Sequence, residues 1–186
     1  MIRSRYAPLI ALAAIVLAGC GSLSSGTAGD SATVPSAAPP SCASQVAAWR
    51  SGPARPAIQA VESDLTTLGK TVSGLGASME AGNAPAGQQA AVQADAAALQ
   101  ADAQTAQAIL PPACAGNARQ DLAAGLGDSA KIAIGCDNAI SEIGSQNYDV
   151  ASADFTAAGN EIAASVRKFS AAADALNAAS QLPAVA

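Results

Sequence analysis

The residues of this 186-residue sequence that offer the most chemistry are its four cysteines, Cys20, Cys42, Cys114 and Cys136. A cysteine thiol can be acylated, oxidised to a disulfide or used as a metal ligand. The sequence contains no histidine, which removes the usual general base and the commonest metal ligand. It also contains no Cys-x-x-Cys pair. We therefore expect the cysteines to attach and cross-link the chain, and we expect no cofactor.

Two pairs of aspartates are the other candidates for chemistry. Asp95 and Asp102 are seven residues apart, and so are Asp121 and Asp128. On a helix each pair could share a face, where it could bind a hard cation or act as a pair of acids. Both pairs fall outside the apolar stripes of their segments, which favours a solvated helix face. We expect neither a metal site nor an enzyme.

Cys20 ends a segment that is typical of a secretory signal. Two arginines precede an apolar run over residues 7–18, which is too short to span a bilayer as a permanent helix. The run ends in Leu17-Ala18-Gly19-Cys20, which resembles the lipobox of bacterial lipoproteins. The resemblance implies that residues 1–19 are removed and that the Cys20 thiol receives a diacylglyceryl group. The alternative is an ordinary signal in which this cysteine is incidental.

Residues 20–41 are predicted to be a lipidated cysteine followed by a flexible linker. Glycine, serine, threonine, alanine and proline dominate the segment, and it carries a single charge. Such a composition buries too little apolar surface to offset the entropy of ordering. The folded part would therefore be tethered to the extracytoplasmic face of the cell membrane.

From residue 42 to residue 182 the sequence predicts an all-α domain. Apolar and small residues recur at spacings of three and four in four successive segments, the a/d pattern of packed helices. These stripes run from Ile58 to Met79, from Val92 to Leu110, from Leu122 to Ile143 and from Ala151 to Ala179. Short connections containing glycine or proline separate them. Because short connections force neighbouring helices to be antiparallel, we expect an up-down-up-down four-helix bundle.

Residues 42–50 are predicted to form a short additional helix across one end of the bundle. Trp49 would plug that end of the bundle. The alternative is that Trp49 lines a ligand pocket. Glycine and two prolines over residues 51–56 separate this helix from the first long one. Asn117 with Gln120 predicts a capping box at the start of the third long helix.

Geometry indicates how the cysteines pair in an oxidising compartment. Cys114 and Cys136 would lie nearly 30 Å apart if the third helix is continuous, whereas a disulfide requires Cα atoms within about 7 Å. Cys42 and Cys114 both belong to one end of the bundle, so we predict a Cys42–Cys114 disulfide. Cys136 falls on an apolar stripe and should be a buried free thiol. The alternative, a reactive thiol, is disfavoured because burial and the neighbouring Asp137 both raise a thiol pKa.

The charge of the mature chain bears on its partners. Without the two signal arginines, seven basic and 14 acidic side chains remain, a formal charge of −7. Nucleic acids and anionic lipids both require a positive footprint, so this charge argues against either as a partner. Arg167 and Lys168 are the only adjacent basic pair, and we expect them on a solvated helix face.

The mature part resembles a loosely defined group of small helical secreted or lipid-anchored actinobacterial proteins. The motifs are Cys42-x6-Trp49, Pro111-Pro112-Ala113-Cys114 and an alanine-rich final helix. The resemblance supports the bundle and the disulfide but implies no activity. Cys136 departs from the two-cysteine pattern of that group.

These observations predict a membrane-anchored, non-enzymatic interaction or structural protein of the cell envelope. Its partners would be the membrane, through Cys20, and another envelope protein, but no nucleic acid. One alternative is a carrier of a small apolar ligand held between the helices. The other alternative is an unrecognised enzyme.

Overall fold

The computed structural model describes residues 40–181. The predictions for the signal and for nearly all of the linker fall on residues 1–39, outside the described residues. Within residues 40–181 the regular structure is helical. The elements are α1 (Cys42–Ser51), α2 (Ala54–Glu80), α3 (Ala86–Gln107), the short 3₁₀ helix η1 (Ala113–Ala115), α4 (Asn117–Gly144) and α5 (Tyr148–Ala179).

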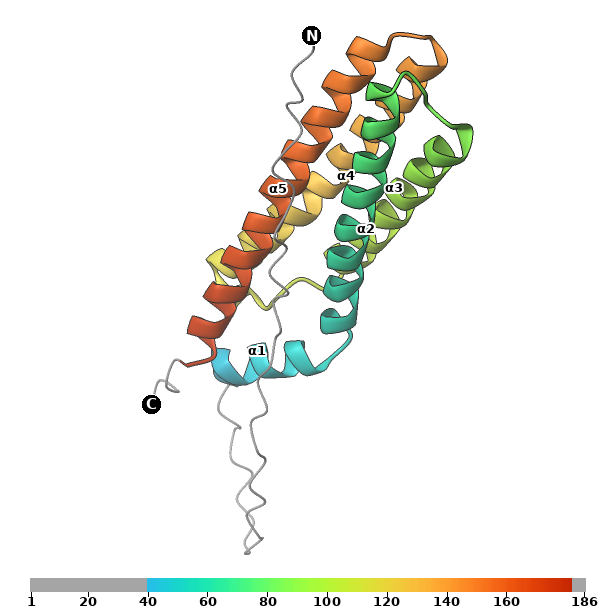
Figure 1. Ribbon diagram of the computed structural model, residues 1–186. Helices are drawn as coiled ribbons and strands as arrows, with labels where there is room; N and C mark the ends of the chain where they lie inside the picture. The colour runs from blue at the N-terminus through green and yellow to red at the C-terminus, as the bar shows by residue number, and fades with distance from the viewer. Residues whose placement is uncertain (1–39, 182–186) are drawn as a thin grey trace, which may run out of the picture. The chain divides into compact units, whose positions relative to one another are not determined.

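The four long helices pack in the order in which they occur in the chain. Helix α2 lies against α3, α3 against α4 and α4 against α5, and α2 and α5 also contact each other (Figure 1). The predicted all-α four-helix bundle with a short N-terminal helix is confirmed. No helix within residues 40–181 is both long enough and apolar enough to cross a membrane.

The predicted stripes form the core of the bundle. The core side chains of α2 are leucine, isoleucine and valine, whereas those of α3 are mainly alanine. The side chains of α3 therefore fill less of the core volume. Buried α2 residues are Ile58, Val61, Leu65, Leu68, Val72 and Leu75, and buried α3 residues are Val92, Ala96, Leu99, Ala103 and Ala106. Phe155 and Phe169, both on α5, are the two buried aromatic side chains of this core. The periodicity of the sequence therefore identifies the buried face of each helix.

Helix α1 lies across the end of the bundle at which α2 begins and α5 ends (Figure 1). The Ser41 side chain caps α1 by accepting a hydrogen bond from the Ser44 amide at 3.2 Å. Val46 is fully buried in a second, smaller core with residues of η1, α4 and α5. We call this end, made by α1, η1 and the adjoining ends of α2–α5, the α1 end. The opposite end, made by the turns at 81–85 and 145–147, is the turn end.

Two predicted helix boundaries differ from the structure. The break over residues 51–56 is confined to Gly52 and Pro53, because Pro56 lies in the first turn of α2, where a missing amide hydrogen costs no hydrogen bond. The predicted capping box of Asn117 and Gln120 is wrong. Gly116 is the N-cap of α4, and no side chain caps the helix. Gly116 has a φ of 48°, a conformation that favours glycine, and Asn117 is already helical.

Candidate functional site

The predicted lipidation site, Cys20, and its lipobox residues Leu17, Ala18 and Gly19 lie outside the described residues. Their role stays a prediction. The described residues bear on it indirectly, through the other three cysteines.

The predicted Cys42–Cys114 disulfide is confirmed. The two Cα atoms are 5.7 Å apart, and the bond joins the first residue of α1 to η1 across a sequence separation of 72. It therefore fixes α1 to the connection between α3 and α4. A cross-link over such a long loop restricts the unfolded chain strongly.

Three side chains reinforce the α1 end around the disulfide. The Trp49 indole donates a hydrogen bond to the Ile109 carbonyl at 2.6 Å, and its half-buried ring contacts both cores. The prediction of Trp49 as a plug is thus confirmed. The Arg50 guanidinium donates to the Asn177 side-chain oxygen at 2.7 Å. The Arg119 guanidinium donates to the Pro111 carbonyl.

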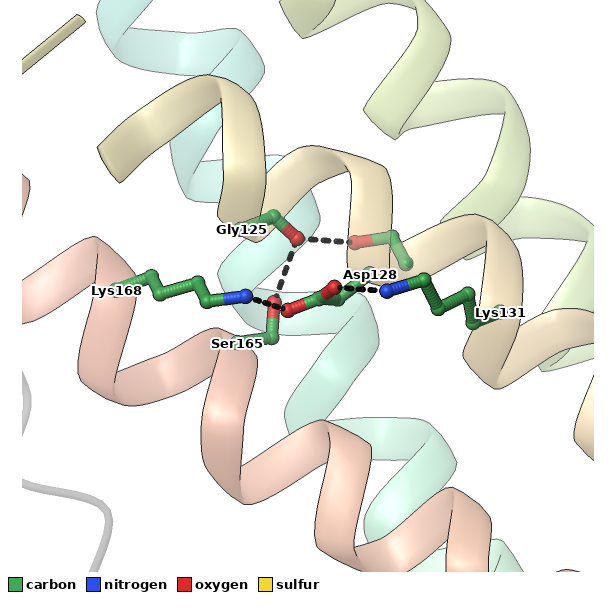
Figure 2. A network of polar contacts seen from close by, with 6 residues as sticks. Gly125, Asp128, Lys131, Ser165 and Lys168 are labelled. Carbon is green, nitrogen blue, oxygen red and sulfur yellow. Dashed lines mark hydrogen bonds and ion pairs between the residues drawn. The ribbon is translucent and has the colours of Figure 1, made fainter. Parts of the chain in front are cut away.

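The most buried charged group of residues 40–181 is Asp128 on α4, which is 3% exposed. Figure 2 shows its carboxylate between two lysines, Lys131 on the next turn of α4 and Lys168 on α5. The Nζ–Oδ distances are 2.9 Å to Lys131 and 2.5 Å to Lys168. Burial alone would raise the pKa of Asp128, but hydrogen bonds and charge from the two lysines outweigh it and lower the pKa. Asp128 is therefore an ionised group that holds α4 against α5.

Two buried serines complete this polar network. The Ser165 hydroxyl on α5 donates to the Gly125 carbonyl of α4 at 2.8 Å, and Ser129 donates to the same oxygen at 3.4 Å (Figure 2). Gly125 leaves room for the Phe169 ring here: a Cβ added to Gly125 would lie 2.8 Å from Cε1 of Phe169. The network is a satisfied cross-link between two helices.

The expectation of a solvated face is wrong for Asp128 and, in part, for Lys168. An a/d stripe covers only part of a helix, whereas α4 packs between α3 and α5 and buries a wider arc. Arg167 is exposed as expected, but the half-buried Lys168 reaches over to Asp128. The acid–base spacing of three between Asp128 and Lys131 was the sequence signal that could have indicated a paired carboxylate.

The carboxylates between α2 and α3 meet without a lysine or arginine. Thr71 on α2 donates to Asp95 on α3 at 2.8 Å. One oxygen of Asp64 is buried and has no hydrogen-bond donor. Burial, then the charge of Asp102, a hydrogen bond to Asp102 and the charge of Asp95 raise the pKa of Asp64. Asp64 was not singled out by the sequence, because its partner Asp102 is 38 positions away in the chain.

Cys136 is a fully buried free thiol on α4, as predicted. Burial, and secondarily the charge of Asp137, raise the pKa of this thiol to about 12. Its thiolate is the reactive form, and it is scarce at neutral pH. Cys136 therefore acts as a small core residue.

Among residues 40–181 no group of three or more histidine, cysteine, aspartate or glutamate side chains could hold a metal ion. The large apolar side chains that the described surface exposes are Ile134 on α4 and Tyr148 and Val150 at the start of α5. Tyr148 and Val150 belong to the turn end.

No family model, curated protein or solved structure matches this chain.

Proposed function

We propose that this protein is a bacterial lipoprotein, anchored through a diacylglyceryl group on Cys20 at the extracytoplasmic face of the cell membrane. Its helical bundle serves there as a non-enzymatic binding or structural module. Two features support the proposal: the lipobox that ends at Cys20, and the way the bundle uses the remaining cysteines.

The cysteine arrangement carries the proposal. Cys42 and Cys114 are consumed by the disulfide. Cys136 is enclosed in the core with a pKa of about 12, so it is a poor partner for exchange. None of the three competes for Cys20, which leaves that thiol available for acylation. Because structural disulfides persist in oxidising compartments, the pair Cys42–Cys114 also agrees with an extracytoplasmic location.

The polar groups buried between α4 and α5 support a binding or structural role. Each Asp128 oxygen accepts a hydrogen bond from a lysine, so this carboxylate is committed to the contact between the two helices. Buried Ser129 and Ser165 are both engaged with the Gly125 carbonyl. These groups stabilise the α4–α5 contact.

Fatty-acid labelling in a bacterial host tests the anchor. The full chain, Cys20→Ala and the matched control Cys136→Ala are expressed with a radiolabelled fatty acid and separated into membrane and soluble fractions. We expect label and membrane retention for the full chain and for Cys136→Ala. Cys20→Ala should incorporate no label. Label that persists in Cys20→Ala, or an unlabelled full chain, would contradict the proposal.

A further inference from the structure

The charged residues of the described chain are segregated along the axis of the bundle. The α1 end comprises residues 40–61, 103–120 and 175–181, which contain Arg50, Arg55 and Arg119 and no acidic residue. The turn end shows the reverse. Residues 71–95 and 135–157 contain six acidic residues and no basic one. The outermost residues of the α1 end therefore carry arginines and no acidic residue, although the chain is acidic in total.

The three arginines of the α1 end have no acidic partner. Arg50 is held by an amide oxygen of Asn177, and its Nε has no acceptor. Arg119 is held by the Pro111 carbonyl. Arg55 is exposed at the start of α2. The two ion pairs formed within residues 40–181 both involve Asp128. Each guanidinium has five N–H donors, so the three groups retain both charge and donors for an external anion.

Four acidic residues directly adjoin these ranges along the helices. They are Glu62, Asp102, Asp121 and Asp174, placed within α2, α3, α4 and α5. Helix α1, which carries Arg50, lies across the end of the bundle (Figure 1). Burial raises the pKa of Glu62, the half-buried member of this group on α2. The screening length at physiological salt is about 8 Å, so each arginine acts mainly on an anion in its immediate surroundings.

The chain enters the domain at this same end. Pro40 immediately precedes α1, and Cys42 is linked to Cys114 within the α1 end. About twenty residues separate Pro40 from Cys20, and if they form the flexible linker that their composition predicts, its root-mean-square reach is roughly 25 Å. An anchor at Cys20 would thus hold the arginine-bearing end at high effective concentration near the lipid surface.

We propose that the α1 end binds the anionic phospholipid headgroups of the membrane to which the chain is attached. Arg50, Arg55 and Arg119 contact headgroup phosphates, and the acidic turn end faces away from the membrane. This inference rests on the proposed lipid anchor. The net charge of −7 disfavours anionic lipid as a partner only if the charges are evenly spread over the surface. Each arginine near an anionic surface strengthens such binding about fivefold.

Trp49, the single tryptophan of the sequence, provides a reporter beside Arg50. The chain from Cys20 to Ala186, which retains every described residue, is coupled through the Cys20 thiol to a maleimide lipid in vesicles. This coupling is chemical, so the test is independent of acylation in cells. The vesicles contain phosphatidylcholine, with or without phosphatidylglycerol, and a headgroup spin-labelled lipid that quenches nearby tryptophan. We expect stronger Trp49 quenching with phosphatidylglycerol and loss of the difference at high salt.

A pair of charge reversals completes the test. Arg55→Glu alters the exposed arginine of the α1 end, and Arg167→Glu makes the same charge change at an exposed position within α5. Arg55→Glu should reduce the phosphatidylglycerol-dependent quenching at least fivefold, and Arg167→Glu should leave it nearly unchanged. Quenching independent of phosphatidylglycerol, or equal effects of both reversals, would overturn the inference. Circular dichroism of both variants verifies that they are folded.

Discussion

The two helical hairpins of the bundle, α2–α3 and α4–α5, place aspartates at their seams with opposite consequences. Asp128 in the α4–α5 seam lies between two lysines, and its pKa is lowered. Asp64 in the α2–α3 seam faces Asp102 without a basic partner, and its pKa is raised. Asp128 therefore stabilises the α4–α5 hairpin through its two lysines, whereas Asp64 in the α2–α3 hairpin faces a like charge. The direction of each pKa shift depends on the partner of the aspartate, which is lysine for Asp128 and another aspartate for Asp64.

The two hairpins also differ in how tightly their glycines are packed. Gly125 in the α4–α5 hairpin lies directly beneath Phe169, so this glycine permits the close approach. Gly74 in α2 has open space where a Cβ would be. We expect the α4–α5 hairpin to tolerate substitution less well than α2–α3.

The largest effect should come from the disulfide, which joins α1 to the connection between the two hairpins. The double variant Cys42→Ala/Cys114→Ala should lose about 4 kcal/mol of unfolding free energy, because it releases a long loop in the unfolded state. Denaturant titration with and without dithiothreitol measures this. Dithiothreitol should destabilise the unsubstituted protein and Cys136→Ala but not the double variant. An unsubstituted protein that is insensitive to dithiothreitol would contradict the pairing.

The next largest effect concerns the paired carboxylate. Asp128→Ala should cost about 2–3 kcal/mol at neutral pH, because it removes a buried carboxylate and its hydrogen bonds to two charged lysines. Asp121→Ala, on the same helix, is the control and should cost less than about 1 kcal/mol. Thermal or denaturant unfolding distinguishes the two. Equal losses would show that the Asp128 network contributes nothing specific.

The stability conferred by Asp128 should depend on pH. Its folded pKa lies below the ordinary value of 3.8, so its contribution is complete above pH 3.8 and is lost as the pH falls through the folded pKa. The difference in stability between the unsubstituted protein and Asp128→Ala should therefore shrink in acid. A difference that stays constant from neutral to strongly acidic pH would exclude an ionised Asp128 as its source.

A matched pair of glycine substitutions compares the packing of the hairpins. Gly125→Ala should destabilise the protein by about 2 kcal/mol, since its Cβ would overlap Phe169 within a rigid core. Gly74→Ala should stabilise it by about 0.5–1 kcal/mol, because alanine favours the helix and meets no neighbour. Phe169→Leu should partly rescue Gly125→Ala. If both glycine variants were stabilised, the close approach of α4 and α5 would be wrong.

The smallest effect is expected at Asp64. Its folded pKa lies above 3.8, so its favourable contribution is complete below pH 3.8 and is lost as the pH rises through the folded pKa. Asp64→Asn should therefore stabilise the protein by about 0.5 kcal/mol at neutral pH, because it removes one of two like charges. The gain should vanish in acid. The exposed Asp137→Asn makes the same change in net charge and serves as the control.

Much of the fold follows from local sequence patterns. The stripes, such as Leu65 and Leu68 in α2, are buried because a helix repeats every 3.6 residues wherever it occurs. The Cys42–Cys114 pairing followed from helix length, since an unbroken α4 keeps Cys114 far from Cys136.

Features that depend on contact between distant segments escaped the sequence. The burial of Asp128 required Lys168 from another helix, 40 residues later. The arginines of the α1 end are scattered in the sequence, and only the crossing of α1 over the bundle brings Arg50 and Arg119 to one end. A net charge sums the charges of the chain and cannot show such a distribution.

One measurement tests the central claim most directly: the intact mass of the protein, extracted from cell membranes and kept non-reduced. We expect a chain that begins at Cys20, carries the mass of a lipidated cysteine and contains one disulfide, with Cys136 unmodified. Peptide mapping should place the lipid on residue 20 and join residue 42 to residue 114. A mature chain without acyl mass, or with residue 20 in a disulfide, would contradict the account.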